Sequence, residues 1–130
     1  MTTKHSDGVT KFNLTAEVKE LESRKPWPKG LTSKTLLKTV DLRIVLIAME
    51  SAAKMEEHHS DGRISIHALS GTIRVHVQQQ EAILRAGDLI SLDRSIKHDV
   101  EAMEDSVFLL TIAWPTAQEL LGLKHRGYGS

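Results

Sequence analysis

The chain has 130 residues, a length typical of one domain, and its 17 lysines and arginines balance 17 aspartates and glutamates, so the formal net charge is zero. This balance gives no overall attraction to nucleic acid or to an anionic membrane, and we expect neither as a partner. The absence of cysteine excludes disulfides, thiolate metal sites and cysteine nucleophiles, and it fits a cytoplasmic location.

The N-terminal segment is predicted to contain one short helix. Its first twenty residues lack the apolar stretch of a secretory signal, and residues 1–12 are predicted to form a polar tail. The segment "LTAEVKELESR" places Leu14, Val18 and Leu21 on one helical face, with Thr15 as the N-cap. "KPWPKG" then ends the helix, because its prolines and glycine cannot continue it. Residues 1–30 are therefore interpreted as an N-terminal tail and short helix.

Residues 31–115 have the pattern of short strands. "RISIHAL" and "TIRVHV" alternate between apolar and polar residues, whereas "TLLKTVDLRIVLIAME" and "SVFLLTIAW" are nearly continuous apolar runs. The longest strongly apolar run, Ile44 to Met49, is far too short to span a bilayer. Turn signals at Gly62, Gly71 and Gly87 separate the runs. This pattern predicts an all-β sandwich or barrel, followed by a C-terminal tail over residues 116–130 that starts with a helical turn.

Two segments combine histidines and glycines at regular spacings. "HHSDGRISIHALSGTIRV" starts at His58, and "GDLISLDRSIKH" runs from Gly87 to His98. In this order they resemble the two motifs of the cupin family, although Asp93 stands where the family has proline and Ser95 where it has glycine. The resemblance covers residues 33 to 114. It implies a double-stranded β-helix, the cupin jelly-roll barrel, with one mouth.

The resemblance also implies a metal site inside that mouth. Metal-binding cupins use two histidines and a glutamate from the first motif and one histidine from the second. His98 matches the second-motif histidine, and either His58 or His59 matches a first-motif position, with Glu57 beside them. The expected glutamate is replaced by Ile64. A divalent metal ion is thus a candidate cofactor, held by a reduced set of His58, His59, His98 and Glu57.

The strand geometry limits this ligand set. Adjacent residues of a strand point to opposite faces, so only one of His58 and His59 is expected to face the cavity. His98 is predicted to line the cavity and to face one of them, and the alternative is a polar residue at a strand end. Glu57 is a ligand only if the register turns it inward.

Other polar residues of this region are assigned to the surface. His67 and His76 are predicted to lie on the outer faces of strands, as are Arg43 and Arg74. An inward-facing arginine in either place would be able to bind a carboxylate substrate bidentately. Several acidic residues near the end of the barrel are expected in a solvated loop: Asp99, Glu101, Glu104 and Asp105.

Three functional hypotheses follow. The first is a cupin that binds or senses a small molecule through an apolar cavity with a histidine pair at its mouth. The second is a metal-dependent enzyme of the dioxygenase or isomerase type that uses His98, one of His58 and His59, and Glu57. The third is a non-catalytic interaction module. A homodimer is expected in addition, because the apolar runs exceed what one small core needs.

Overall fold

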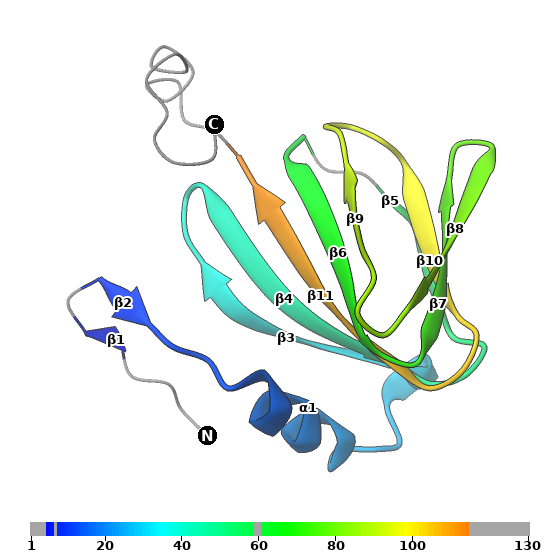
Figure 1. The fold of residues 1–130 in the computed structure, drawn as a ribbon. Helices are drawn as coiled ribbons and strands as arrows, with labels where there is room; N and C mark the ends of the chain where they lie inside the picture. Colours follow the sequence, from blue (N-terminus) through cyan, green and yellow to red (C-terminus); the bar gives the residue numbers. More distant parts are fainter. Residues whose placement is uncertain (1–4, 7, 59–60, 115–130) are drawn as a thin grey trace.

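The computed structural model describes residues 5–6, 8–58 and 61–114, which form two antiparallel sheets packed face to face and one short helix (Figure 1). The five-stranded sheet has the order β3 (Leu31–Lys38), β4 (Leu42–Met49), β11 (Ser106–Ala113), β6 (Arg63–Ser70) and β9 (Leu89–Leu92). The four-stranded sheet has the order β5 (Lys54–His58), β10 (His98–Ala102), β7 (Thr72–Val77) and β8 (Gln80–Arg85). The predicted all-β architecture with a short N-terminal helix is confirmed.

Strand alternation builds the main core between the two sheets. On β6, Ile64, Ile66 and Ala68 are at most 2% exposed, whereas the residues between them face outward. Ile66 pairs with Leu110 of β11 and with Ile90 of β9, so one apolar row crosses three strands. The four-stranded sheet supplies the opposite wall through its own buried residues, which include Ile73, Val75, Leu84, Val100 and Ala102. The period-two pattern of the sequence therefore marks the inner faces correctly.

Two predicted glycine turns are confirmed. Gly71 has a φ of +76° and connects β6 to β7, which belong to different sheets. A Cβ atom at this position would lie 2.3 Å from the carbonyl oxygen of Asp105, so no larger residue fits without movement of the backbone. Gly87 has a φ of +96° and connects β8 to β9. A positive φ is unfavourable for residues with a side chain, which explains the glycines.

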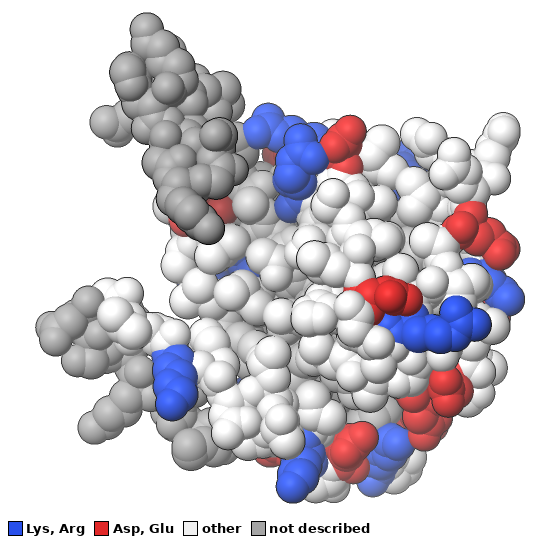
Figure 2. All heavy atoms as spheres, in the orientation of Figure 1, with Lys and Arg blue, Asp and Glu red and all other residues white. Residues whose placement is uncertain are grey.

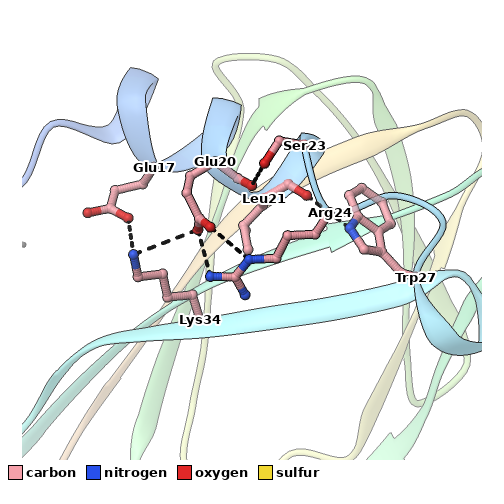
Figure 3. Close-up of polar contacts among 7 residues, drawn as sticks. All are labelled: Glu17, Glu20, Leu21, Ser23, Arg24, Trp27 and Lys34. Atoms are coloured by element: carbon pink, nitrogen blue, oxygen red, sulfur yellow. Dashed lines mark hydrogen bonds and ion pairs between the residues drawn. The ribbon is translucent and has the colours of Figure 1, made fainter. Parts of the chain in front are cut away.

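Helix α1 (Leu14–Glu22) covers part of the outer face of the five-stranded sheet. Leu21 and Trp27 form a second core with three residues of the sheet: Leu46, Ala48 and Val107. The indole Nε1 of Trp27 donates a hydrogen bond to the Leu21 carbonyl over 3.0 Å, and Lys34 of β3 forms an ion pair with Glu17 (Figure 3). In the part of the chain that the structure describes, no helix is long and apolar enough to cross a membrane.

Several sequence predictions need correction. The N-cap of the helix is Asn13 rather than the predicted Thr15, and the first helical residue is Leu14. The side chain of Asn13 accepts a hydrogen bond from the Ala16 amide and so caps the helix. The predicted polar tail contains a short strand pair, β1 (His5–Ser6) with β2 (Val9–Thr10). Asp99 and Glu101 lie in strand β10 rather than in a loop. The helical turn predicted after Pro115 lies outside the described residues.

Candidate functional site

One end of the barrel gathers the candidate site residues. β4, β6 and β10 begin at this end, and β11 and β7 end there, so the strands bring together residues that are far apart in the sequence. In Figure 1 the strands fan out toward it, opposite to the turn at Gly71. We call it the mouth end and define it by Arg43, Asp61, His98 and Trp114.

His98 is the first residue of β10 and lies on the inner face of the four-stranded sheet. Its exposed fraction is 2%, and the next inner positions of the strand, Val100 and Ala102, are 0% and 1% exposed. Its ring Nδ1 lies 3.2 Å from the carbonyl oxygen of Ile96. A carbonyl only accepts hydrogen bonds, so this contact makes Nδ1 the N–H group, and a neutral ring then carries its acceptor lone pair on Nε2. His98 is thus a buried, oriented imidazole.

The backbone of His58 lies directly beside His98. The two residues are register partners in the β5–β10 ladder, and His98 pairs with Val77 on its other side. The register shifts after this pair, since Val100 is opposite Met55, so β5 has one more residue than β10 in this stretch. The side chains of Glu57 and His58 and all of His59 lie outside the described residues, and their roles stay predictions.

A cavity of about 290 Å³ lies next to these strands. Its lining is mostly apolar and includes Leu31, Val45, Ile47 and Met55 together with the hydroxyl residues Thr32 and Ser33. Met55 pairs with Val100, which is the next inner residue after His98 on β10. His98 therefore lies one inner-facing position nearer to the mouth end than the Val100–Met55 pair at the cavity wall.

Arg43 lies near the start of β4 on the inner face of the five-stranded sheet, as His98 does at the start of β10 on the other sheet. It alternates with Val45 and Ile47, which are 9% and 4% exposed and belong to the main core. Its guanidinium carbon lies 5.5 Å from the centre of the Trp114 ring, and Trp114 packs against the same core. The expected outward orientation of Arg43 is therefore wrong. β4 is apolar on both faces, so its sequence does not show which face is the inner one.

Trp114 and Asp61 were not singled out from the sequence. The indole Nε1 of Trp114 donates a hydrogen bond to Asp61 Oδ1 over 2.7 Å. The neighbouring Gly62 leaves room for this contact, since a Cβ there would lie 2.9 Å from the indole nitrogen. The only sequence signals were a tryptophan at the end of a strand and an Asp-Gly turn, which lie far apart in the sequence. Together Asp61 and Gly62 hold the indole beside Arg43.

Comparison with known proteins identifies the family. The Cupin domain family matches residues 45–113, which is more than half of the chain. The chain belongs to the cupin family. No curated protein matches it.

Solved structures agree with this assignment. A conserved protein of unknown function from Streptococcus pyogenes is 26% identical, with a TM-score of 0.65 over 68% of this chain and 78% of that one. A cupin-2 domain protein from Shewanella frigidimarina has a TM-score of 0.64 at 14% identity and covers 79% of this chain and 94% of its own. KdgF from Halomonas sp. has a TM-score of 0.60 at 21% identity, over 68% and 83%. The last two show the shared fold alone.

The described part of this cupin does not supply a complete metal-ligand set. Ile64 stands at the place of the expected glutamate, is 2% exposed and pairs with Leu92 and Ile112 within the core. Among the described residues, no three histidine, aspartate or glutamate side chains lie close enough together to hold a metal ion. Catalytic zinc sites usually have three protein ligands. Of the four predicted ligands, only the side chain of His98 lies within the described part of the chain.

The outer face of the four-stranded sheet of this cupin carries a second polar group. His76 of β7 lies between Asp99 of β10 and Glu81 of β8, with its Nδ1 2.8 Å from Asp99 and its Nε2 3.0 Å from Glu81. The hydrogen bond that His76 donates to Asp99 is the main cause that raises the pKa of His76, and Glu81 adds to it. Arg74 forms ion pairs with Glu101 at 3.4 Å and Glu81 at 3.6 Å. The predicted outward positions of His76 and Arg74 are confirmed.

Proposed function

We propose that this cupin binds a small organic molecule in its inner cavity, with His98 as the polar contact at the mouth end. One observation carries the proposal: a buried, oriented imidazole lies one inner-facing position beyond the Val100–Met55 pair at the cavity wall. Ligand sites in proteins are typically concave and mostly apolar, with a few placed polar groups that orient the ligand. The inner face of this barrel is likewise mostly apolar, with His98 as a placed polar group.

The cavity indicates the kind of ligand. About 290 Å³ is at the lower end of the range for ligand pockets and suits a body of a few carbon atoms. Val45, Ile47 and Met55 contribute an apolar wall, so the body of the ligand is apolar. Ser33 is exposed and lines the cavity, which places an opening on the β3 side.

A titration with hexanamide tests this proposal. We expect hexanamide to shift the methyl resonance of Met55 in NMR spectra of the wild type. Ser33→Trp should block the opening and abolish the shift. Arg85→Trp, at an exposed residue of β8 that does not line the cavity, is the control and should bind as the wild type does. An unchanged Met55 signal in the wild type, or the same shift in all three proteins, would contradict the proposal.

Metal binding is a second candidate, favoured by the orientation of the His98 ring. A metal-ligating histidine typically donates its other ring N–H to a backbone carbonyl or carboxylate, as Nδ1 of His98 does to Ile96. Directly opposed positions of an antiparallel pair share one face, so His58 is the proposed second ligand, with Glu57 or His59 completing the set. Metal-dependent chemistry of the dioxygenase or isomerase type depends on this site.

Calorimetry with nickel or zinc tests the metal site on protein without an affinity tag. Binding is expected in the wild type and in His76→Gln, which alters a histidine on the outer face of β7. It should be lost in His98→Ala and in His58→Ala. Equal binding in all four proteins would place the metal elsewhere, and no binding in the wild type would exclude the metal-dependent enzyme.

The proposed partner is a second copy of this chain, bound through the outer face of the five-stranded sheet. Figure 2 shows few charged side chains over β4, β11 and β6. Leu89 of β9 is 61% exposed on this face, next to its register partner His67. Sedimentation equilibrium should show a dimer that Leu89→Lys dissociates. Val40→Lys, at a turn residue that is 88% exposed, is the control, and a monomeric wild type would contradict the proposal.

A further inference from the structure

Arg43 is a cation placed on the apolar inner face of the barrel. It is the second residue of β4 (Leu42–Met49), and its register partner on β11 is Ile112, which is 9% exposed and belongs to the main core. The next inner residue of the strand, Val45, lines the cavity. A charged side chain in such a position loses part of its hydration and needs compensation from an acceptor.

The described structure gives the Arg43 guanidinium a ring to stack on but no acceptor. Its carbon lies 5.5 Å from the centre of the Trp114 ring. Its Nε is shielded from solvent and has no hydrogen-bond partner within residues 8–58 and 61–114. In this part of the chain Arg43 also forms no ion pair, whereas Arg63 at the same end binds Asp93 at 2.6 Å.

The acidic residues near Arg43 are engaged by other groups. Asp61 accepts the indole N–H of Trp114, and Asp41 accepts the hydroxyl of Thr39 over 2.9 Å. The Asp61 contact holds the ring beside the guanidinium, and neither aspartate forms an ion pair with Arg43 within the described residues. The arrangement therefore holds an oriented cation at the mouth end.

We propose that Arg43 recognises a carboxylate of the bound molecule, so that the ligand of this cupin is a small organic anion with an apolar body. The inference rests on the proposed function above and adds the chemical class of the ligand. A guanidinium offers five donors in a planar fork that matches the two oxygens of a carboxylate. The Trp114 ring, whose centre lies 5.5 Å from the guanidinium carbon, restricts the positions that this fork can take. The apolar body would extend past Val45 into the cavity, because Val45 is one inner position deeper than Arg43.

Hexanoate and hexanamide differ in charge but have the same apolar body, and they separate this inference from the proposed function. By calorimetry, hexanoate should bind the wild type at least about ten-fold more tightly than hexanamide, because a hydrogen bond to a charged group contributes more than a neutral one. In Arg43→Met, which keeps an unbranched stem beside the indole, the two affinities should become equal within about two-fold. Arg43→Lys should retain part of the preference, since it keeps the charge but loses the fork.

Two further measurements locate the effect. Arg63→Met removes the paired arginine at the same end and should keep the wild-type preference for hexanoate. The indole N–H resonance of Trp114, assigned with Trp114→Phe, should shift when hexanoate is added, and that of the distant Trp27 should not.

The outcomes are distinct. Tight hexanoate binding in the wild type that falls to the level of hexanamide in Arg43→Met supports the inference. Equal affinities of the two probes for the wild type, or an unchanged preference in Arg43→Met, would overturn it and leave the proposed function intact. If neither probe binds the wild type, the proposed function fails, and the inference fails with it.

Discussion

The mouth end and the outer face of the four-stranded sheet each hold one arginine and one histidine, in opposite settings. On the outer face, Arg74 and His76 of β7 contact three carboxylates from the two neighbouring strands: Glu81, Asp99 and Glu101. At the mouth end, Arg43 and His98 lie on inner faces beside the apolar residues Ile112 and Val77, and their register partners on the other side are Lys38 and His58. The same residue types thus face carboxylates in one place, whereas in the other their register partners are not acidic.

Register explains the difference. His76 is directly opposite both Asp99 and Glu81, and Arg74 is directly opposite Glu101, so cross-strand neighbours meet without any help from loops. Each basic residue of this outer row contacts a carboxylate of an adjacent strand, although the Nε of Arg74, 3.6 Å from Glu81, has no hydrogen-bond partner among the described residues. Arg43 forms no ion pair within the described residues, which agrees with its proposed role toward a ligand.

The largest effect is expected when a carboxylate is added to the inner face. Ile64→Glu places a charge at a position that is 2% exposed, and an uncompensated buried charge costs roughly 3–5 kcal/mol. Burial should raise the pKa of the new carboxyl group, so the folded state holds the proton more tightly than the unfolded state. The loss of unfolding free energy in Ile64→Glu should therefore be smaller near pH 5 than near pH 8. At the higher pH, ionisation of the carboxyl group stabilises the unfolded state more than the folded state.

Urea unfolding at both pH values measures this effect. Ile64→Gln is the matched control, since its polar side chain has a similar size and does not titrate. A loss in Ile64→Glu that equals the loss in Ile64→Gln at each pH would show that the introduced charge is compensated, for example by Arg43 in the same cross-strand row, and the predicted pH dependence would then be wrong.

A smaller loss is expected from His98→Ala. His98 is 2% exposed and bound to the Ile96 carbonyl, so truncation removes packing and a hydrogen bond and should cost about 2 kcal/mol. Arg85→Ala alters an exposed residue at the end of β8 and should cost less than about 0.5 kcal/mol. Chemical denaturation of both variants tests this difference. Equal losses would mean that His98 is not part of the packed inner face.

These residues also show which features the sequence could predict. The strands and the glycine turns followed from period-two alternation and from turn residues, because one face of β6 and β7 is clearly polar. Arg43 was assigned wrongly for a physical reason. On β4 both faces are apolar, since Leu46 and Ala48 pack under α1 while Val45 and Ile47 face the main core. Alternation then cannot distinguish the inner face from the outer one.

The cupin motifs predicted the place of His98 but not the whole site. The resemblance places His98 on the inner side of the barrel, and its burial agrees with that position. The orientation of the residues opposite it depends on the register shift between β5 and β10, which no local pattern in the sequence specifies. Asp99 and Glu101 were assigned to a loop because their charge obscured the alternation with Val100 and Ala102. Cytoplasmic location stays a prediction.

The outer row should make stability depend on pH through His76. The hydrogen bond to Asp99, aided by Glu81, raises the pKa of His76 in the folded state. Its contribution should therefore be fully present below the unfolded value of about 6.5 and be lost as the pH rises through the higher folded value. The difference in unfolding free energy between the wild type and His76→Gln should shrink over that window. An NMR titration that gives His76 a pKa at or below the unfolded value would contradict this expectation.

The smallest effects distinguish the two arginines. Arg74 is about one-third exposed and its pairs are solvent-accessible, so Arg74→Met should lower stability by no more than about 0.5 kcal/mol, and less at high salt. Arg43→Met should be neutral or slightly stabilising, because it removes a shielded donor that has no partner in the described structure and keeps a flexible apolar side chain against Trp114. Unfolding curves at low and high salt measure both variants. If Arg43→Met were the more destabilising change, Arg43 would belong to the structural framework of the barrel. A neutral Arg43→Met with impaired carboxylate binding would instead show that the barrel retains this cation for its ligand, since a group that contributes no stability needs another reason to remain in an apolar wall.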